Sequence, residues 1–157
     1  MRAATVMLGA LLALPMAAGA VETRPLGDPW TTCARAIAAA ERDARLPAGL
    51  LPAIARVESG RARPGGGVAP WPFALNIAGE GRFPETAEDA IATVEASRAR
   101  GIRSIDVGCM QVNLVFHPGA FATLADAFDP PTNVAYAVRF LRALHARSGN
   151  WAEAIAQ

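Results

Sequence analysis

Glycine and proline divide this chain of 157 residues into short apolar stretches, and this division limits the possible folds more than any other feature. Between the breaks, apolar residues recur at spacings of three and four, which is typical of amphipathic helices. No stretch beyond residue 20 is long enough and apolar enough to cross a bilayer. The pattern predicts helices over 28–45, 47–60, 86–101, 121–128, 132–149 and 151–157.

Helix signals support several of these ranges. Asp28-Pro29 combines an N-cap residue with a proline suited to the first helical position, and Thr86 and Thr132 are similar caps. Gly60 fits the end of the second helix. The expected buried stripes are Leu50, Ile54 and Val57 in the second helix, and Val134, Val138, Leu141 and Leu144 in the fifth.

Extended structure is expected around residues 71–83, and a short extended piece is expected over 102–105. Residues 60–70 are rich in glycine and proline, and we expect an irregular loop there. The segments 71–77 and 82–83 flank Gly79-Glu80-Gly81, which is typical of a small hairpin. The segment 106–113 follows a short extended piece and is expected to lead from a turn into a helix. The sequence therefore predicts a mainly helical α+β domain with one small β-hairpin.

The N-terminus has the pattern of an export signal. Arg2 precedes an apolar run over 3–17, and Ala18-Gly19-Ala20 is a small-residue cleavage pattern. Removal of residues 1–20 leaves 157 − 20 = 137 residues, enough for one domain. We expect a leader over 21–30, a single domain over 31–157, a periplasmic location and no membrane span after signal removal.

Charge and cysteine content narrow the function further. The 15 basic residues are all arginines against 14 acidic ones, so loss of Arg2 leaves a formal charge of zero. A neutral chain lacks the basic surface that nucleic acids or anionic lipids bind. Cys33 and Cys109 suggest one disulfide in an exported protein, the alternative being two buried free thiols. No metal pattern is visible.

Glu58 is the first candidate for chemistry. It follows Val57 at the end of the second predicted helix, beside the apolar stripe, where desolvation favours a protonated carboxyl. A carboxyl that stays neutral near pH 7 suits a general acid for glycosidic cleavage. The alternative is a solvated surface glutamate.

A second group of candidates lies in the block Gly-Cys-Met-Gln-Val-Asn over 108–113. Gln111 and Asn113 are amides, which both donate to and accept from sugar hydroxyl and N-acetyl groups. Asp106 is interpreted as a carboxylate that holds backbone N–H groups at this turn. His117 is interpreted as a hydrogen-bonded structural residue and Tyr136 as a core residue.

Three blocks in order resemble the soluble lytic transglycosylase family. They are Glu-Ser-Gly at 58–60, Gly-x-Met-Gln-Val-Asn at 108–113, and Asn-Val-x-x-Ala-x-x-Phe-Leu from Asn133. The small periplasmic members linked to flagella and secretion systems are most similar, sharing the Trp-Pro hairpin at 71–76 and an early partner cysteine. The resemblance covers about residues 31–157.

This resemblance implies a lysozyme-like fold and cleavage of peptidoglycan glycan strands between N-acetylmuramic acid and N-acetylglucosamine. Glu58 would be general acid and then base while a 1,6-anhydro ring closes, without a metal or cofactor. It also implies substrate-binding roles for Ser59, Met110, Gln111, Asn113 and Asn133, with structural roles as the alternative for both asparagines. A flagellar or secretion-system assembly is the implied partner.

One family motif has no counterpart here. The family carries a tyrosine motif soon after a segment like 151–156, and this sequence stops at Gln157. We therefore expect a domain truncated at its C-terminus. The alternative functions are a non-catalytic peptidoglycan-binding or assembly protein and a muramidase that hydrolyses the same bond.

Overall fold

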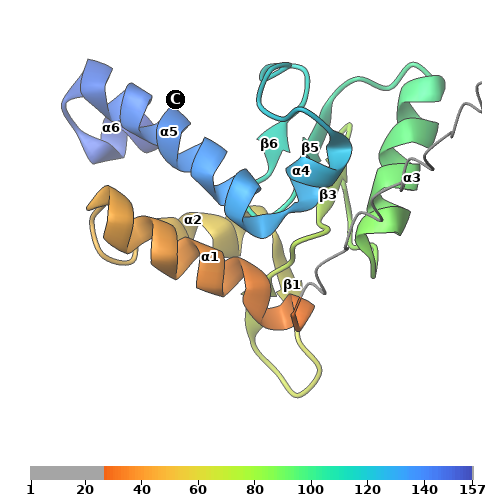
Figure 1. Cartoon of the computed structure of the whole chain (residues 1–157), viewed down its shortest axis with the longest axis horizontal. Coiled ribbons are helices and arrows are strands. Elements are labelled where there is room, and N and C mark those ends of the chain that lie inside the picture. The colour runs from red at the N-terminus through yellow and green to blue at the C-terminus, as the bar shows by residue number, and fades with distance from the viewer. Residues whose placement is uncertain (1–26, 157) are drawn as a thin grey trace, which may run out of the picture.

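The structure is a computed structural model that describes residues 27–156. The predicted signal at 1–20 and most of the predicted leader lie outside this range. Within it, six helices and six short strands form a helical part and a sheet part that lie side by side (Figure 1). The predicted α+β class is confirmed, although the strands are more numerous than the single hairpin expected.

The helical part contains α1 (Pro29–Ala44), α2 (Leu50–Glu58), α5 (Pro130–Ser148) and α6 (Trp151–Ile155). The cap of α1 is as predicted, because the Asp28 carboxylate accepts a hydrogen bond from the Trp30 N–H at 3.1 Å. This helix begins two residues before the predicted domain boundary at 31. Asp129, not Thr132, caps α5, and the two prolines occupy its first turn, where no intrahelical donor is needed.

The predicted stripe of α2 is wrong in one position. Leu51 and Ala55 are fully buried, whereas Val57 is 84% exposed. The helix starts at Leu50 because Gly49 takes a left-handed conformation and the Glu41 carboxylate of α1 accepts N–H bonds from Gly49 and Leu51. The contact with α1 therefore fixes the start of α2.

The glycine-rich segment at 60–70 is not the irregular loop expected from its composition. β1 (Gly60–Ala62) and β2 (Val68–Pro70) pair as an antiparallel hairpin. The turn between them contains Gly65, Gly66 and Gly67, all with positive φ. Glycine adopts this backbone conformation without steric cost. The glycines that led us to expect an irregular loop therefore form the turn that joins the two strands.

The larger sheet is antiparallel, in the order β4 (Glu80–Arg82), β3 (Leu75–Ile77), β5 (Ile105–Val107) and β6 (Val112–Asn113). The predicted 71–83 hairpin corresponds to β3 and β4. The block 106–113 is strand, turn and strand, which corrects the predicted turn-to-helix segment. α3 (Ala87–Ala99) and α4 (Leu124–Phe128) pack beside this sheet.

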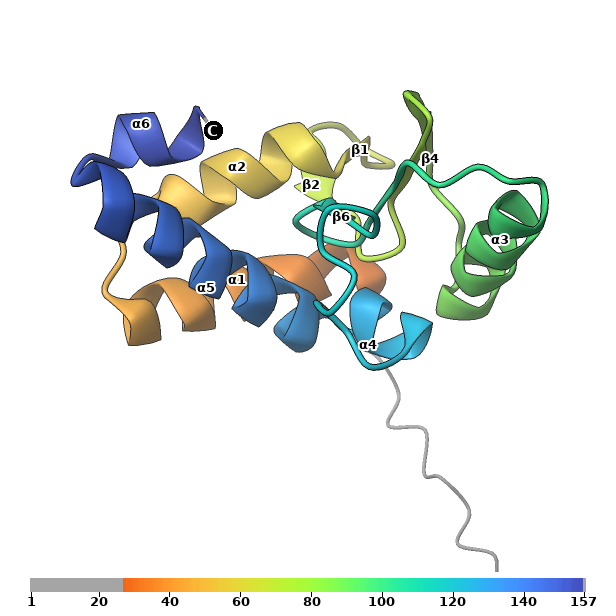
Figure 2. The same cartoon turned by 90° about the horizontal axis from the view of Figure 1, so that it is seen from above.

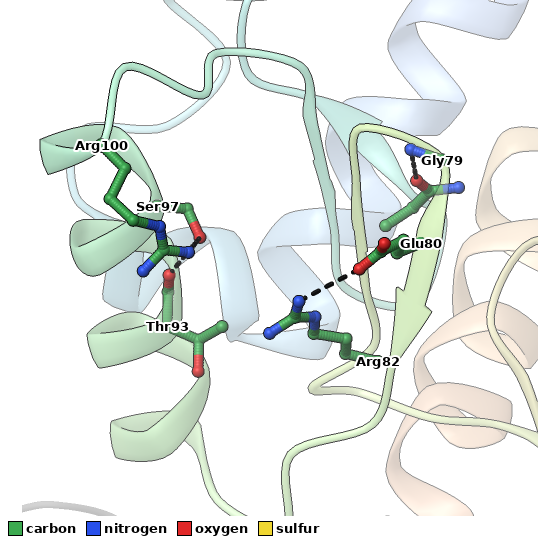
Figure 3. Close-up of polar contacts among 7 residues, drawn as sticks. Gly79, Glu80, Arg82, Thr93, Ser97 and Arg100 are labelled. Atoms are coloured by element: carbon green, nitrogen blue, oxygen red, sulfur yellow. Dashed lines mark hydrogen bonds and ion pairs between the residues drawn. The ribbon is translucent and has the colours of Figure 1, made fainter.

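Polar contacts close the β3–β4 turn and the neighbouring turns of α3 (Figure 3). The Asn76 side-chain oxygen accepts from the Gly79 N–H at 2.8 Å, and Glu80 pairs with Arg82 at 3.2 Å. On α3, the Ser97 hydroxyl donates to the Thr93 carbonyl at 2.8 Å. Glu80 is thereby held at the surface as a structural ion pair.

A disulfide between Cys33 and Cys109 ties α1 to the turn between β5 and β6, with both residues buried in the helical core. This confirms the pairing, and disulfides are typical of proteins in oxidising compartments. Among residues 27–156, no helix combines the length and apolar character that crossing a bilayer requires.

Removal of this disulfide is expected to destabilise the domain strongly. The bond closes a loop of 76 residues, and the chain-entropy treatment assigns such a loop a contribution of about 4 kcal/mol. Replacing both cysteines by alanine should lower the free energy of unfolding by about that amount, as measured by urea denaturation under oxidising conditions. Equal stability of the two proteins would contradict the prediction.

Candidate active site

A cleft of about 240 Å³ is lined by residues of α2, α5, α6 and β6. Figure 2 shows how these elements are arranged. The apolar walls of the cleft come from the helices and its polar residues come mainly from the sheet end and the loop that follows. It is lined by Leu51, Ile54, Glu58, Met110, Gln111, Val112, Asn113, His117, Tyr136, Ala137, Phe140, Leu141, Leu144, Ala154 and Ile155.

Glu58 is the last residue of α2 and projects into this cleft. It follows Leu51 and Ile54 by seven and four residues, so all three share one face of the helix. The side chain is open to solvent, yet the cleft walls partly desolvate its carboxyl. This burial, and secondly the negative charge of Asp106, raise the pKa of Glu58 above its ordinary value of 4.5. The predicted environment is therefore present, with Ile54, and not the exposed Val57, lining the cleft beside Glu58 on the same helix face.

Met110 and Gln111 line the same cleft, at the turn between β5 and β6. The Gln111 Nε2 donates to the carbonyls of Ala74 and Gly108, both at 3.0 Å. No donor among residues 27–156 bonds its side-chain oxygen, which remains able to accept from a ligand. Gln111 also has a φ of 45°, a left-handed conformation that is uncommon and costly outside glycine.

Asn113 lies at the edge of the cleft but its amide is already engaged. Its Nδ2 donates to the Asp106 carboxylate at 2.7 Å, and its oxygen accepts N–H bonds from Val115 and Phe116. Asp106 therefore holds a side-chain amide and not the backbone N–H groups that the sequence suggested. Both residues organise the loop after β6.

His117 and Tyr136 are cleft residues that sequence reasoning did not assign to the site. The Tyr136 hydroxyl lies 2.8 Å from the His117 Nδ1, and Phe140 packs edge-on against the same imidazole. The hydrogen bond agrees with the predicted structural role of His117, but Tyr136 is only half-buried. No local sequence pattern predicts that these two residues meet, because they are 19 positions apart and come together only through tertiary folding.

Ser59 and Asn133 lie away from the cleft, contrary to the predicted contact with a ligand. Ser59 is 1% exposed and its hydroxyl contacts the carbonyls of Ala55 and Cys109. Asn133 is fully buried, accepting from the Met110 N–H and donating to the Val107 and Ala127 carbonyls. Because these polar atoms bond backbone groups in the core, both residues hold the segment that carries Met110 and Gln111.

The chemistry available in the described part of the cleft is that of one perturbed carboxyl surrounded by amides, an imidazole and a phenol. Across residues 27–156, no group of three or more histidine, cysteine, aspartate or glutamate side chains is arranged to hold a metal ion. The arrangement suits proton transfer by Glu58 to a polar ligand.

No protein-family model, curated protein or solved structure matches this chain.

Proposed function

We propose that the protein is a peptidoglycan lytic transglycosylase that cleaves the β-1,4 bond between N-acetylmuramic acid and N-acetylglucosamine. The observation that carries this proposal is the position of Glu58, a carboxyl with a raised pKa in a cleft that also holds Gln111. The order of the three sequence blocks, which resembles that family, supports the same substrate.

In the proposed reaction Glu58 acts twice. It first donates its proton to the glycosidic oxygen, and the bond from that oxygen to the anomeric carbon breaks. The resulting carboxylate then accepts the proton of the muramic acid's own hydroxymethyl group, whose oxygen bonds to the anomeric carbon. A 1,6-anhydro ring forms, Glu58 is reprotonated and no water is consumed. A single carboxyl that is protonated at the start suits this sequence.

The other cleft residues have supporting roles in this proposal. Gln111 accepts from a sugar hydroxyl or N-acetyl N–H through its free oxygen. The accessible apolar residues of the walls, Ile54, Ala137 and Phe140, contact the sugar ring faces and exclude water from Glu58. Asn113, Ser59 and Asn133 act by holding the strands and the turn in place.

One observation favours hydrolysis as the second candidate. Asp106 is close enough to influence Glu58 electrostatically, and ordinary glycoside hydrolases use two carboxyl groups. A muramidase would cleave the same bond and leave a reducing end, so the two candidates differ in the chemical end of the product.

The test is digestion of purified sacculi followed by mass spectrometry of the soluble muropeptides. Anhydro-terminated products that are absent with Glu58→Gln support the proposal. Products with reducing ends would indicate a muramidase instead. A folded protein that releases neither product would instead favour a non-catalytic peptidoglycan-binding or assembly role.

We also propose a periplasmic location and action beside an envelope-spanning assembly of the flagellar or secretion type. The signal pattern over 1–20 and the Cys33–Cys109 disulfide support export to an oxidising compartment. Fractionation of cells that express the full chain would test this, since a cytoplasmic protein with free thiols contradicts it.

A further inference from the structure

A second pocket, of about 350 Å³, lies beside the loop that follows β6, and we call it the arginine pocket. Figure 2 shows this loop between α5 and the connection from α3 to β5, and Figure 1 agrees. The pocket is lined by Arg98 of α3, by Ile102 and Arg103 of that connection, and by Leu114, Val115 and Pro118 of the loop. Its walls therefore combine two arginines with four apolar side chains.

The end of α3 is a turn that brings Arg103 back to Arg98. The Gly101 N–H donates to the Arg98 carbonyl at 2.9 Å. The next N–H, that of Ile102, donates to the Ser97 carbonyl at 3.1 Å. Gly101 has a φ of 82°, the left-handed conformation with which many helices end. Both arginines consequently line one pocket, although one belongs to the helix and the other to the connection that follows it.

The loop that forms the rest of the pocket wall is also held by hydrogen bonds. The Leu114 N–H donates to the Ile105 carbonyl of β5 at 2.9 Å. The Asn113 side-chain oxygen accepts from the N–H groups of Val115 and Phe116 at 2.9 and 3.1 Å. Because both walls are fixed by backbone contacts, little conformational freedom is lost when a ligand enters the pocket.

Shared residues connect the arginine pocket to the cleft that holds Glu58. A neighbouring pocket of about 230 Å³ shares Arg98, Leu114 and Pro118 with the arginine pocket. The same neighbouring pocket shares His117 with the Glu58 cleft. A ligand that occupies the cleft can therefore extend past His117 to the two arginines.

The positive charges of the arginine pocket are available to a ligand. Arg98 and Arg103 are exposed, and within residues 27–156 neither forms an ion pair. No acidic side chain of the described residues lines this pocket or the neighbouring one. Guanidinium groups bind carboxylates through paired N–H bonds. The ligand that fits is therefore a carboxylate with short aliphatic groups, which would face Ile102, Leu114 and Val115.

We propose that the arginine pocket binds the peptide stem of peptidoglycan, with Arg98 and Arg103 pairing with its carboxylates. This inference rests on the proposed function and extends it from the glycan strand to the attached peptide. The stem consists largely of alanine and acidic amino acids, which supply both the aliphatic groups and the negative charge. It is bonded to muramic acid, so a sugar in the cleft brings the peptide to the adjoining surface.

The test compares binding of two soluble, dye-labelled glycan strands, one with its stem peptides and one stripped of them by an amidase. All proteins carry Glu58→Gln, so that the strands stay intact. The double variant Arg98→Gln, Arg103→Gln should bind peptide-bearing strands about tenfold more weakly, the loss expected for one charge-assisted hydrogen bond. Its binding to stripped strands should not change. Fluorescence anisotropy measures both dissociation constants.

Two further variants control for charge. Arg142→Gln removes one positive charge from an exposed position of α5 that lines none of these pockets, and it should bind both strands as before. The double variant Arg98→Lys, Arg103→Lys keeps both charges and should retain the preference for peptide-bearing strands. Equal weakening of both strands in the glutamine variant, or no weakening of either, overturns the inference.

A second measurement leaves both arginines unaltered and decides the matter if the glutamine variant does not fold. Peptide-bearing strands whose stem carboxylates have been converted to amides keep the aliphatic groups but lose the negative charge. They should bind like stripped strands. If the amidated strands bind as tightly as the untreated ones, carboxylates are not what the pocket recognises.

The binding assay separates this inference from the proposed function, because it needs no turnover. If the protein with an unaltered Glu58 cleaves sacculi but the arginine variant shows no selective loss, the inference fails and the proposed function stands. If the arginines give a preference for peptide-bearing strands but sacculi are not cleaved, the proposed enzyme activity fails and the peptide site stands.

Discussion

Glu58→Gln is expected to reduce the release of soluble muropeptides from sacculi by about 10³-fold, the range typical for removal of a general acid–base group. Glutamine keeps the shape and polarity of the side chain but cannot donate or accept the transferred proton. The same carboxyl serves both proposed steps. Its replacement therefore removes both the initial protonation of the glycosidic oxygen and the later deprotonation of the hydroxymethyl group. The rate is measured from the initial release of products at saturating sacculi.

The pH dependence of this activity has a definite sign. The general acid works in its protonated form, and burial together with Asp106 raises the pKa of Glu58 above 4.5. The protonated fraction, and with it the rate, should therefore fall as pH rises through the Glu58 pKa. An activity that increases across that interval would contradict the role of Glu58 as the initial acid.

The same shift predicts that Glu58→Gln does not destabilise the domain at neutral pH. A carboxyl whose pKa is higher in the folded chain binds more protons there than in the unfolded chain, so folding stability falls as pH rises between the two values. Glutamine has no such dependence. Urea denaturation should show the variant equal to or more stable than the unaltered protein at pH 7, with this advantage disappearing below pH 4.5.

That stability measurement is also the control for the kinetic one. If Glu58→Gln were less stable at neutral pH, lost activity would reflect unfolding and would carry no information on catalysis. Glu153→Gln is a matched surface control, since Glu153 is exposed on α6 and its carboxylate forms no ion pair within residues 27–156. It should retain full activity.

Asn133→Ala is expected to lower the free energy of unfolding by about 4 kcal/mol. Asn133 is fully buried, and its amide bonds the Met110 N–H, the Val107 carbonyl and the Ala127 carbonyl at 2.9, 3.0 and 2.9 Å. Alanine would leave these three backbone groups without partners in the core and would add a cavity. The change is measured by urea denaturation.

The matched control is Asn150→Ala. Asn150 also bonds backbone N–H groups, those of Ala152 and Glu153, but it does so as the exposed cap of α6. Water replaces an exposed partner, so its loss should cost only about 1 kcal/mol. If the two variants lose similar amounts of unfolding free energy, the burial of Asn133 does not contribute the extra stability predicted here.

Gly108 explains why Asn133 can approach the turn so closely. A Cβ at this position would lie 2.9 Å from the Ala127 carbonyl oxygen and would collide with the Asn133 amide, and the φ of Gly108 is 79°. The bare backbone therefore lets the asparagine side chain fit between β5 and α4. This pair of residues fixes the turn that presents Met110 and Gln111 to the cleft.

Several elements of the fold could be predicted because they depend on neighbouring residues. Asp28-Pro29 starts α1, Thr86 caps α3, and the spacing from Val134 to Leu144 gives the buried face of α5. Predictions failed where long-range contacts decide the outcome. Glu41 determines the start of α2, and strand pairing converts the segment 60–70 and the block 106–113 into extended structure.

The candidate site divides in the same way. The sequence indicated Glu58 and Gln111, because a carboxyl at the end of an apolar helix face and an amide in a glycine-bounded turn are local patterns. It could not tell which polar residues face the cleft. Ser59 and Asn133 are turned into the core, whereas Tyr136 and His117 come together on the cleft wall.

The sequence by itself determined the helix-rich class, the identity of the candidate acid and the pair of cysteines available for a disulfide. Only the tertiary structure decided that Asp106 and Asn113 are cross-strand partners and that Asn113 and Glu58 line the same cleft. Helix caps and apolar spacing act over a few residues and can be read along the chain. The electrostatic environment of a carboxyl depends on which distant residues packing brings within a few ångströms, and no local pattern encodes that distance.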